Sequence, residues 1–318
     1  MLAPEELYVV DDDALAALTS SPKADDARGP VLLHALQGFV DAGGAASLAT
    51  RHLLAELPSR PLARFDVDQV LDYRARRPRM EFREDHFESV EMPELVLHLV
   101  KDAEDHPFLV LTGPEPDFQW QRFTAAVLQL VERTGTELTI GLHGIPWAAP
   151  HTRPVGLTPH ASDRSLIAGR PRWVGDVSVP GHASALLELR LAEAGHTTMG
   201  FTAHVPHYLA AAEFPPASVT LLDAVSETTG LALPTLRLRE AGVDVLTEVD
   251  KQVAASPDTQ EAVHQLEVQY DAVAAGRTLE GPGLLSPSLP ADEMPDGDEL
   301  AADFERYLRQ LGESGTTS

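Results

Sequence analysis

The chain has 318 residues, of which 43% are hydrophobic, and its formal net charge is −25 because 49 acidic residues outnumber 24 basic ones. This length and apolar content support one large domain or two smaller ones. The negative charge would repel a phosphate backbone and an anionic lipid surface, so neither nucleic acid nor a membrane is an expected partner. The absence of cysteine excludes disulfides, thiolate metal sites and a thiol nucleophile.

No segment approaches the ~20 consecutive apolar residues that span a bilayer. The first 13 residues are acidic and lack the basic start and apolar core of a secretory signal. We therefore expect a cytoplasmic protein.

Apolar runs and amphipathic stretches alternate through the first two thirds of the chain. The runs that predict strands are 31–35, 63–70, 95–100, 109–111, 137–142 and 198–203. The stretches with helical character are 45–57, 118–133 and 183–194. This alternation predicts a three-layer α/β/α sandwich with a mostly parallel central sheet. Residues 72–90 are rich in charge, and we expect loops there.

The pattern becomes continuously helical from residue 236. Apolar residues recur at helical spacing on both sides of Ser256-Pro257-Asp258, which predicts two antiparallel helices with Ser256 or Asp258 as the cap between them. Residues 281–297 are rich in proline, glycine and acid and indicate a linker, followed by a short helix over 298–311. The predicted division is an α/β/α domain over 1–235, a C-terminal helical hairpin over 236–276, and a linker, short helix and tail over 277–318.

Two segments, 144–151 and 203–208, each end an apolar run with proline, histidine and an aromatic ring. Loops beyond the carboxyl ends of strands line the ligand crevice of many α/β domains. The segments therefore predict the rim of a cleft, with ligand-binding candidates that are His151, Arg153, His204, His207 and Tyr208.

A glycine loop follows the first long apolar run and contains Gly38, Asp41 and Gly43. A nucleotide phosphate would lie here in a dinucleotide-binding fold, but the spacing is not G-x-G-x-x-G and Asp41 would repel phosphate. The other interpretation is that the glycines permit a tight turn while Asp41 caps the next helix. Both interpretations stay open.

A second loop carries Glu115, Asp117 and Trp120 after a predicted strand. Two acids in different environments could act as general acid and base. Asp117 is also well placed to cap the following helix, which leaves Glu115 as the less explained residue. Further along the charge-rich stretch, Arg74, Arg76 and Arg77 suit either an anion or surface ion pairs, and ion pairs are the plainer interpretation.

Three imidazoles could in principle converge as a zinc site from among His143, His151, His204 and His207. Proline-bearing loops are a poor scaffold for that purpose, and loop histidines commonly bond to carbonyl groups. We therefore predict no metal and no cofactor. A serine hydrolase is also disfavoured, because the sequence has no G-x-S-x-G motif.

Taken together, several motifs resemble the bacterial branch of the proteasome assembly chaperone family. They are GFVDAG (38–43), FDVD (65–68), DYR (72–74), TGPEPD (112–117), GIP (144–146), PHTRP (150–154) and HVPHYL (204–209). The resemblance covers about residues 31–234 and extends to the C-terminal helical hairpin. It implies a sandwich similar to the phosphorylase/hydrolase-like fold, self-association, for instance as a homotrimer, and proteasome subunits as partners. Archaeal relatives dock through a hydrophobic-tyrosine-any tail, and this sequence departs from that pattern with Gly315-Thr316-Thr317-Ser318.

Two functions follow from these observations. The first is a non-enzymatic, oligomeric protein with an interaction or assembly role. The alternative is a hydrolase or phosphorylase that acts on a small nucleoside-like or peptide-like substrate at the carboxyl ends of the strands. In the alternative, Glu115, His151 and His207 are the acid and base candidates, and Arg153 holds an anion.

Overall fold

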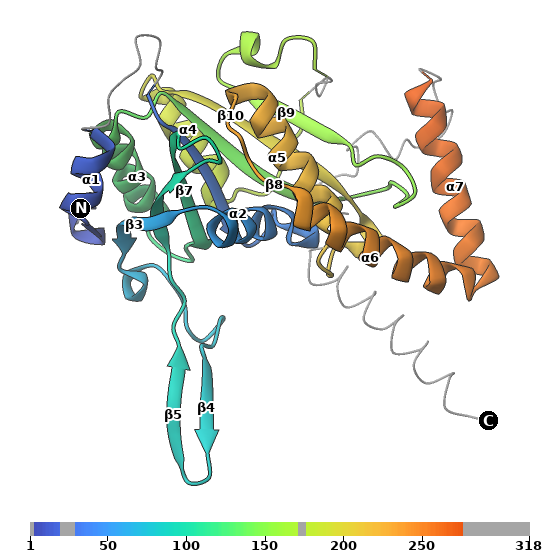
Figure 1. The fold of residues 1–318 in the computed structure, drawn as a ribbon, viewed down its shortest axis with the longest axis horizontal. Helices are drawn as coiled ribbons and strands as arrows, with labels where there is room; N and C mark the ends of the chain where they lie inside the picture. The colour runs from blue at the N-terminus through green and yellow to red at the C-terminus, as the bar shows by residue number, and fades with distance from the viewer. Residues whose placement is uncertain (1–2, 20–28, 171–175, 276–318) are drawn as a thin grey trace.

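The computed structural model describes residues 3–19, 29–170 and 176–275 (Figure 1). Its centre is an eight-stranded sheet with the order β1-β3-β6-β7-β2-β8-β10-β9. The strands of this sheet are β1 (Tyr8–Val10), β2 (Val31–Gln37), β3 (Ser59–Phe65), β6 (Val96–Lys101), β7 (Pro107–Pro114), β8 (Leu138–Trp147), β9 (Leu157–Ala161) and β10 (Thr197–Pro206). The four central strands β7, β2, β8 and β10 are parallel, and the flanking strands pair antiparallel.

Helices cover both faces of the sheet, which confirms the predicted three-layer sandwich. Alternate residues of β2 point to opposite faces. The helices of the body are α1 (Asp12–Thr19), α2 (Ala45–Glu56), α3 (Trp120–Thr134), α4 (Ala183–Glu193) and α5 (Pro215–Thr229). Leu33 and Ala35 belong to the core under α2 and α5, and Leu32 and Leu36 to the core under α3 and α4.

The charge-rich stretch contains a β-hairpin where we expected loops. Strands β4 (Arg79–Arg83) and β5 (His86–Glu91) pair antiparallel and project from the body (Figure 1). The prediction was wrong because the charges alternate with apolar side chains such as Met80 and Phe82, and this period of two is typical of a strand.

The two proline-histidine segments begin as strand rather than as loop. Strands β8 and β10 continue in register to the pair Trp147 and Pro206, so Gly144–Trp147 lies beside Ala203–Pro206. Beyond the apolar runs, the backbone N–H and C=O groups of each strand are still paired with those of the other strand. The sequence prediction ended both strands about four residues too early.

Two further helices, α6 (Leu236–Ala254) and α7 (Pro257–Ala274), follow the body. Helix α6 packs on α5, and α7 leaves α6 at an open corner rather than running back along it (Figure 1). Of the two predicted caps, Ser256 accepts the bond from the Thr259 N–H at 3.3 Å. The domain division stays a prediction, and its third part lies outside the described residues, as do the linker and the helix expected over 298–311.

Within the described ranges, none of the helices has the length and apolar character required to cross a membrane.

Phe123 of α3 is fully buried and its ring centroid lies 5.4 Å from that of Phe65. We predict that Phe123→Ala lowers the free energy of unfolding by about 3–5 kcal/mol, because it leaves a cavity in the core under α3. Denaturant titration measures this loss. The control is Phe118→Ala, since that ring is 52% exposed and should change stability by about 0.5 kcal/mol at most. Equal losses in the two variants would contradict the assignment of Phe123 to the core.

Candidate functional site

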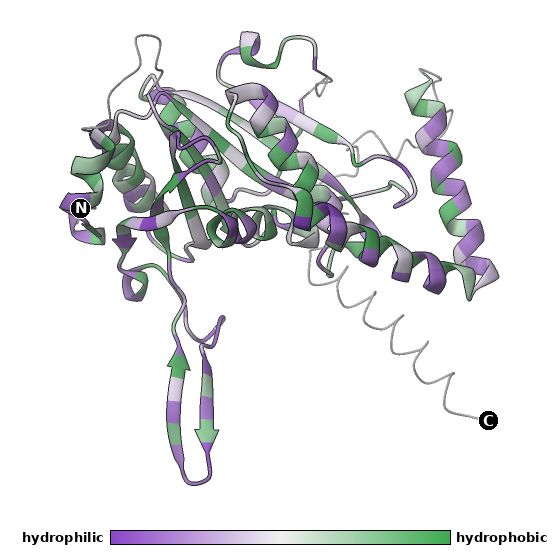
Figure 2. Cartoon of the chain, in the orientation of Figure 1, coloured by the Kyte–Doolittle hydropathy of each residue, from purple (hydrophilic) through white to green (hydrophobic). Residues whose placement is uncertain are grey.

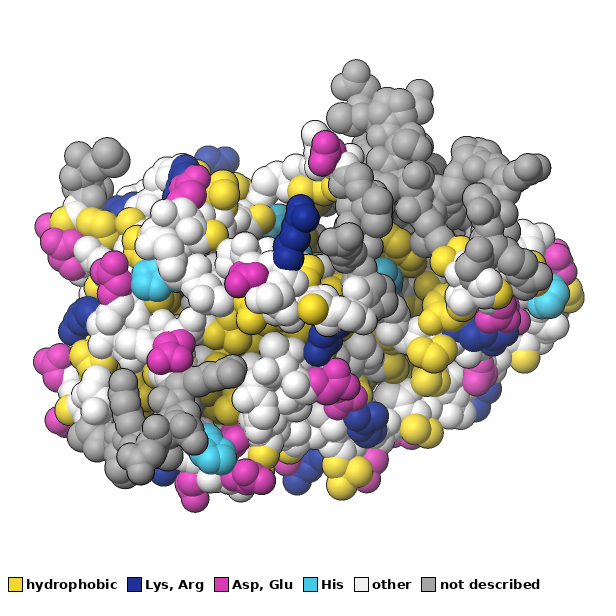
Figure 3. Space-filling view, turned by 90° about the horizontal axis from the view of Figure 1, so that it is seen from above, with side chains coloured by type: hydrophobic (Ala, Val, Ile, Leu, Met, Phe, Trp, Pro, Cys, Tyr) yellow, Lys and Arg dark blue, Asp and Glu magenta, His cyan; other side chains and the backbone are white. Residues whose placement is uncertain are grey.

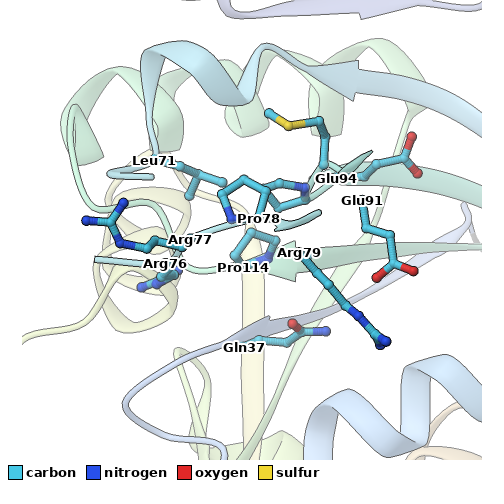
Figure 4. A pocket seen from close by; sticks show the side chains of 12 residues that line it. Gln37, Leu71, Arg76, Arg77, Pro78, Arg79, Glu91, Glu94 and Pro114 are labelled. Carbon is cyan, nitrogen blue, oxygen red and sulfur yellow. The ribbon is translucent and has the colours of Figure 1, made fainter. Parts of the chain in front are cut away.

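Two open grooves lie at the carboxyl ends of β2 and β7. The larger has a volume of about 410 Å³ and lies against the base of the β4–β5 hairpin. Arg76 and Arg77 lie on one side of it and Glu91 and Glu94 on the other (Figure 4). The smaller groove has about 240 Å³ and includes His98. Neither groove is lined by any of the ten candidates, which are Gly38, Asp41, Gly43, Glu115, Trp120, His151, Arg153, His204, His207 and Tyr208.

Glu115 is buried and joins the glycine loop to the start of α4. Its Oε1 accepts the Ala183 N–H at 2.6 Å, and its Oε2 accepts the Phe39 N–H at 3.4 Å. Gly38 leaves room for this carboxylate, because a Cβ at that position would lie 2.4 Å from Oε2. The structure thus brings Gly38 and Glu115 together, and the Glu115 carboxylate connects the backbone at Phe39 with the backbone at Ala183.

Asp41 lies at the start of α2. Its Oδ1 accepts the Ala46 N–H at 2.8 Å and the Ser47 N–H at 3.2 Å, as a helix-capping carboxylate does. Burial raises the pKa of Asp41, and these hydrogen bonds oppose the shift. Gly43 has a φ of 65° and lies against Phe214 and Val205, so a tight turn and a close approach both need glycine there.

His151 and Tyr208 connect the proline-histidine segments to α6. The Tyr208 hydroxyl accepts the His151 backbone N–H at 2.8 Å and lies 2.7 Å from its Nδ1, and Nε2 lies 3.0 Å from an oxygen of Asp250. With its ring proton on Nε2, the imidazole donates to Asp250 and accepts the Tyr208 hydroxyl proton at Nδ1. Burial raises the pKa of Tyr208 to about 12, so the phenol keeps its proton.

Arg153 makes the corresponding connection to α7. Its guanidinium meets both oxygens of Asp271, at 2.9 Å and 2.8 Å, and it bonds to Glu267 at 3.2 Å. The Tyr270 hydroxyl donates to the Pro154 carbonyl at 3.0 Å. The PHTRP segment, 150–154, thus positions the C-terminal helices.

The remaining candidates do not take part in these hydrogen bonds. His204 stacks on Trp147 with ring centroids 4.1 Å apart, and its Nε2 lies 2.8 Å from the Thr158 hydroxyl. His207 is exposed and its ring lies edge-on to Tyr208. The Trp120 indole donates to the Pro116 carbonyl. Of the three arginines considered for an anion, Arg76 pairs with Asp117 at 3.0 Å and Arg77 lines the larger groove, where Arg74 does not contribute.

A buried polar cluster lies under α4. In the strand register, His34 of β2 pairs with Gly141 of β8, Gly141 with Gly200 of β10, and Gly200 with His160 of β9. These four residues form one row across four strands, and paired residues share a face of the sheet. Leu32 and Leu36 lie two residues before and after His34 in the strand, so all three side chains point to the same face. Because Leu32 and Leu36 belong to the core under α4, this is the face that α4 covers.

Glu188 of α4 enters this row. Its Oε1 lies 3.0 Å from the Nε2 of His143 and 3.8 Å from the Nε2 of His34, and its Oε2 lies 2.6 Å from the Nε2 of His160. His182, the cap residue of α4, packs its ring 5.5 Å from that of His143. Of the four histidines that the sequence might have gathered, only His143 belongs to this cluster.

The pKa values of the residues in this cluster are shifted in different directions. Burial would raise the pKa of Glu188, but the hydrogen bonds from His143 and His160 outweigh it and hold that pKa well below its usual range. Burial acts to lower the pKa of His160, and the hydrogen bond and charge of Glu188 overcome it and raise that pKa. Burial lowers the pKa of His34 and of His182 to about 4. The pKa of His160 is thus raised beside two imidazoles, those of His34 and His182, whose pKa values are lowered.

Among the described residues, His143, His160 and Glu188 form the group whose donor atoms lie close enough to share a metal ion, within 4.8 Å of one another. Sequence reasoning missed this group because its members come from β8, β9 and α4. One signal was available: His34 and His143 each interrupt an apolar strand run, and a buried polar side chain needs a partner.

We predict that Glu115→Ala lowers the free energy of unfolding by about 1–3 kcal/mol, because two backbone N–H groups lose their acceptor. Thermal or denaturant unfolding measures the loss. Glu94→Ala is the control, since Glu94 is exposed and forms a surface ion pair with Arg64. A Glu115 variant as stable as the Glu94 variant would refute the structural role of Glu115.

Burial lowers the pKa of His204 from 6.5 to about 4. The unfolded chain therefore takes up this proton first, and stability is lost as the pH falls from about 6.5 to about 4. We predict that His204→Gln removes up to about 3 kcal/mol of that loss, at 1.36 kcal/mol per pKa unit. Denaturant titrations at pH 7 and pH 4.5 measure the difference. His207→Gln is the control with an exposed histidine, and the same flattening in both variants would contradict the prediction.

The comparisons with known proteins agree with this architecture. The family model described as PAC2 family matches residues 35–253. A Mycobacterium tuberculosis protein of unknown function is 45% identical, with a TM-score of 0.79 over 85% of this chain and 93% of its own. A Corynebacterium glutamicum protein of unknown function is 36% identical, with a TM-score of 0.78 over 86% of this chain and 99% of its own. A second Mycobacterium tuberculosis structure, described as a proteasome-assembly chaperone homologue, is 23% identical, with a TM-score of 0.68 over 73% of this chain and 99% of its own. No curated protein matches. The chain belongs to the PAC2 family.

Proposed function

We propose that the protein is an oligomeric assembly factor that acts by protein–protein contact, with the β4–β5 hairpin as its contact element. The observation that carries this proposal is the exposed apolar face of that hairpin. The fold shared with the proteasome-assembly chaperone homologue of Mycobacterium tuberculosis supports the same class of function. The proposed location is the cytoplasm.

Every residue of β4 and β5 is exposed. Met80 pairs with Val90 and Phe82 with Phe87, and paired residues lie on one face of a hairpin. The two phenylalanine side chains are 59% and 66% exposed, and their rings meet edge to face at 5.1 Å. Apolar residues thus extend along strands that stand in solvent (Figure 2).

The other face of the hairpin is charged. Arg79 pairs with Glu91, and Arg83 forms an ion pair of 2.8 Å with Glu88. A two-stranded hairpin is only marginally stable in water, because it has no core of its own. An apolar face rimmed by charge is typical of a surface that a partner covers.

The favoured occupant of this face is a second copy of the chain. Residues 74–79 at the hairpin base contain four arginines and no acid, whereas the whole chain has a net charge of −25. Acidic side chains are also spread over the end of the molecule opposite the hairpin (Figure 3). An arginine-rich base that meets an acidic copy is electrostatically complementary. Proteasome α-subunits are the proposed partners of the resulting oligomer.

We predict that the wild-type protein is a homo-oligomer and that the double variant Phe82→Ser, Phe87→Ser is a monomer, since the contact loses its apolar centre. Light scattering coupled to size exclusion over a range of concentrations measures the mass. The hairpin lies outside the core, so the variant should remain folded, and circular dichroism checks this. Phe118→Ser is the matched control on the body and should remain an oligomer. A monomeric wild type, or an oligomeric double variant, would contradict the proposed contact.

The assembly role has a separate test. Purified protein is mixed with unassembled proteasome α-subunits, and native mass spectrometry follows binding and ring formation. We expect a complex and a changed rate of ring assembly. A lack of both would exclude the role at the proteasome, while the self-association result would stand by itself.

The alternative, a hydrolase or phosphorylase, needs Glu115, His151 and His207 in one cleft. Glu115 bonds to the start of α4, His151 bonds to Asp250 of α6, and neither described groove contains any of the three. The geometry therefore favours the assembly role. Thermal-shift screening with nucleosides, phosphate and peptides tests the alternative, because a specific ligand raises the melting temperature by mass action.

A further inference from the structure

We propose that the cluster under α4 is a binding site for a transition-metal ion of the Zn²⁺ class, with His143, His160 and Glu188 as ligands and His34 as the fourth. This inference is independent of the proposed function. It assigns a structural role to the ion, which would connect β2, β8, β9 and α4.

The space for the cluster is built into the sheet by two glycines. A Cβ at Gly141 would lie 2.1 Å from Oε1 of Glu188 and 2.7 Å from Nε2 of His143. A Cβ at Gly200 would lie 2.3 Å from Nε2 of His160. Neither glycine has a positive φ, so neither is required by its backbone conformation. Each provides room for the donor atoms instead, between the histidines at the two ends of the row.

The donor atoms are spaced as the ligands of a small ion are. Zn²⁺ bonds to imidazole nitrogen at about 2.0–2.1 Å and to carboxylate oxygen at about 2.0–2.2 Å, so the ligands of a tetrahedral site lie roughly 3.4 Å apart. Glu188 oxygens lie 3.0 Å from His143, 2.6 Å from His160 and 3.8 Å from His34. The donor atoms of His143, His160 and Glu188 all lie within 4.8 Å of one another, so small shifts would bring them around one ion. His34 lies outside this group, and its ring would have to move further toward Glu188 to become the fourth ligand.

Unpartnered nitrogen atoms provide a second, independent observation. Both ring nitrogens of His34 are buried without a hydrogen-bond partner among the described residues, and so is Nδ1 of His143. The His34 side chain is fully buried and faces Glu188. Of these atoms, Nε2 of His34 faces Glu188 at 3.8 Å. Buried polar atoms in native proteins nearly always have a partner, so this nitrogen points to a group at the cluster that the protein chain does not supply.

The chemistry of the donor set selects the kind of ion. Imidazole nitrogens with one carboxylate suit Zn²⁺ and its neighbours, whereas Mg²⁺ and Ca²⁺ prefer oxygen ligands. The side chain of His160 is 45% exposed, which provides a path of entry from solvent. Glu188 supplies the negative charge that compensates part of the charge of the ion.

The test is metal binding by the full-length protein after treatment with a chelator. Isothermal titration with Zn²⁺ measures affinity and stoichiometry, and Co²⁺ reports ligand geometry through its visible spectrum. We expect one tightly bound Zn²⁺ per chain, a tetrahedral Co²⁺ spectrum and a melting temperature that rises with added Zn²⁺. Loss of a residue that only hydrogen-bonds to a metal ligand typically lowers metal affinity by about 10–100-fold. Loss of a ligand itself costs more, so His160→Ala and Glu188→Gln should each weaken binding by at least about 100-fold.

His160→Ala is the decisive variant, because its side chain is 45% exposed and Glu188 keeps its hydrogen bond with His143 when His160 is removed. Circular dichroism checks that each variant is folded. His207→Ala is the matched control, since it removes an exposed histidine outside the cluster and should bind Zn²⁺ as the wild type does. Absence of stoichiometric binding by the wild type, or equal binding by the wild type and the folded His160→Ala variant, would overturn the proposal and leave the cluster as a buried ion pair.

Discussion

A charged carboxylate buried in a protein core has to be paired, and the pairing of Glu188 organises the centre of this molecule. The partners of Glu188 are His143 and His160, and Gly141 and Gly200 leave the space in which they meet. Because these residues belong to adjacent strands, the pairing depends on the register of β8, β9 and β10. A slip of one residue would turn the row of side chains to the other face and leave Glu188 unpaired.

The polar residues at the carboxyl edge of the sheet serve mainly as connections in this structure. Glu115 and Asp41 accept hydrogen bonds from the starts of α4 and α2, and His151 and Arg153 reach the C-terminal helices. The same edge carries the β4–β5 hairpin, whose apolar face has no cover within the described chain. Loops that are held by hydrogen bonds, beside a hairpin with an exposed apolar face, suit contact with another protein.

Much of the fold could be predicted because the spacing of apolar residues along the sequence indicates which face of a helix or strand is buried. The alternation of apolar runs with helical stretches indicated the sandwich, and Ser256 before Pro257 indicated the break between α6 and α7 but not the open corner that the two helices form there. The pattern failed at the hairpin, where the density of charge hid the alternation of Met80 and Phe82 with charged neighbours. It also ended β8 and β10 too early, since pairing between strands extended both of them beyond their apolar runs.

The sequence by itself determined the layers of the sandwich, the family resemblance and the exclusion of thiol chemistry, because periodicity, motifs and composition are properties of the linear chain. Only the tertiary structure decided which polar residues meet. His34, His143, His160 and Glu188 are far apart in sequence, and the strand order β2-β8-β10-β9 brings them together under α4. Strand order and register are set by packing over the whole sheet, and local spacing does not encode them.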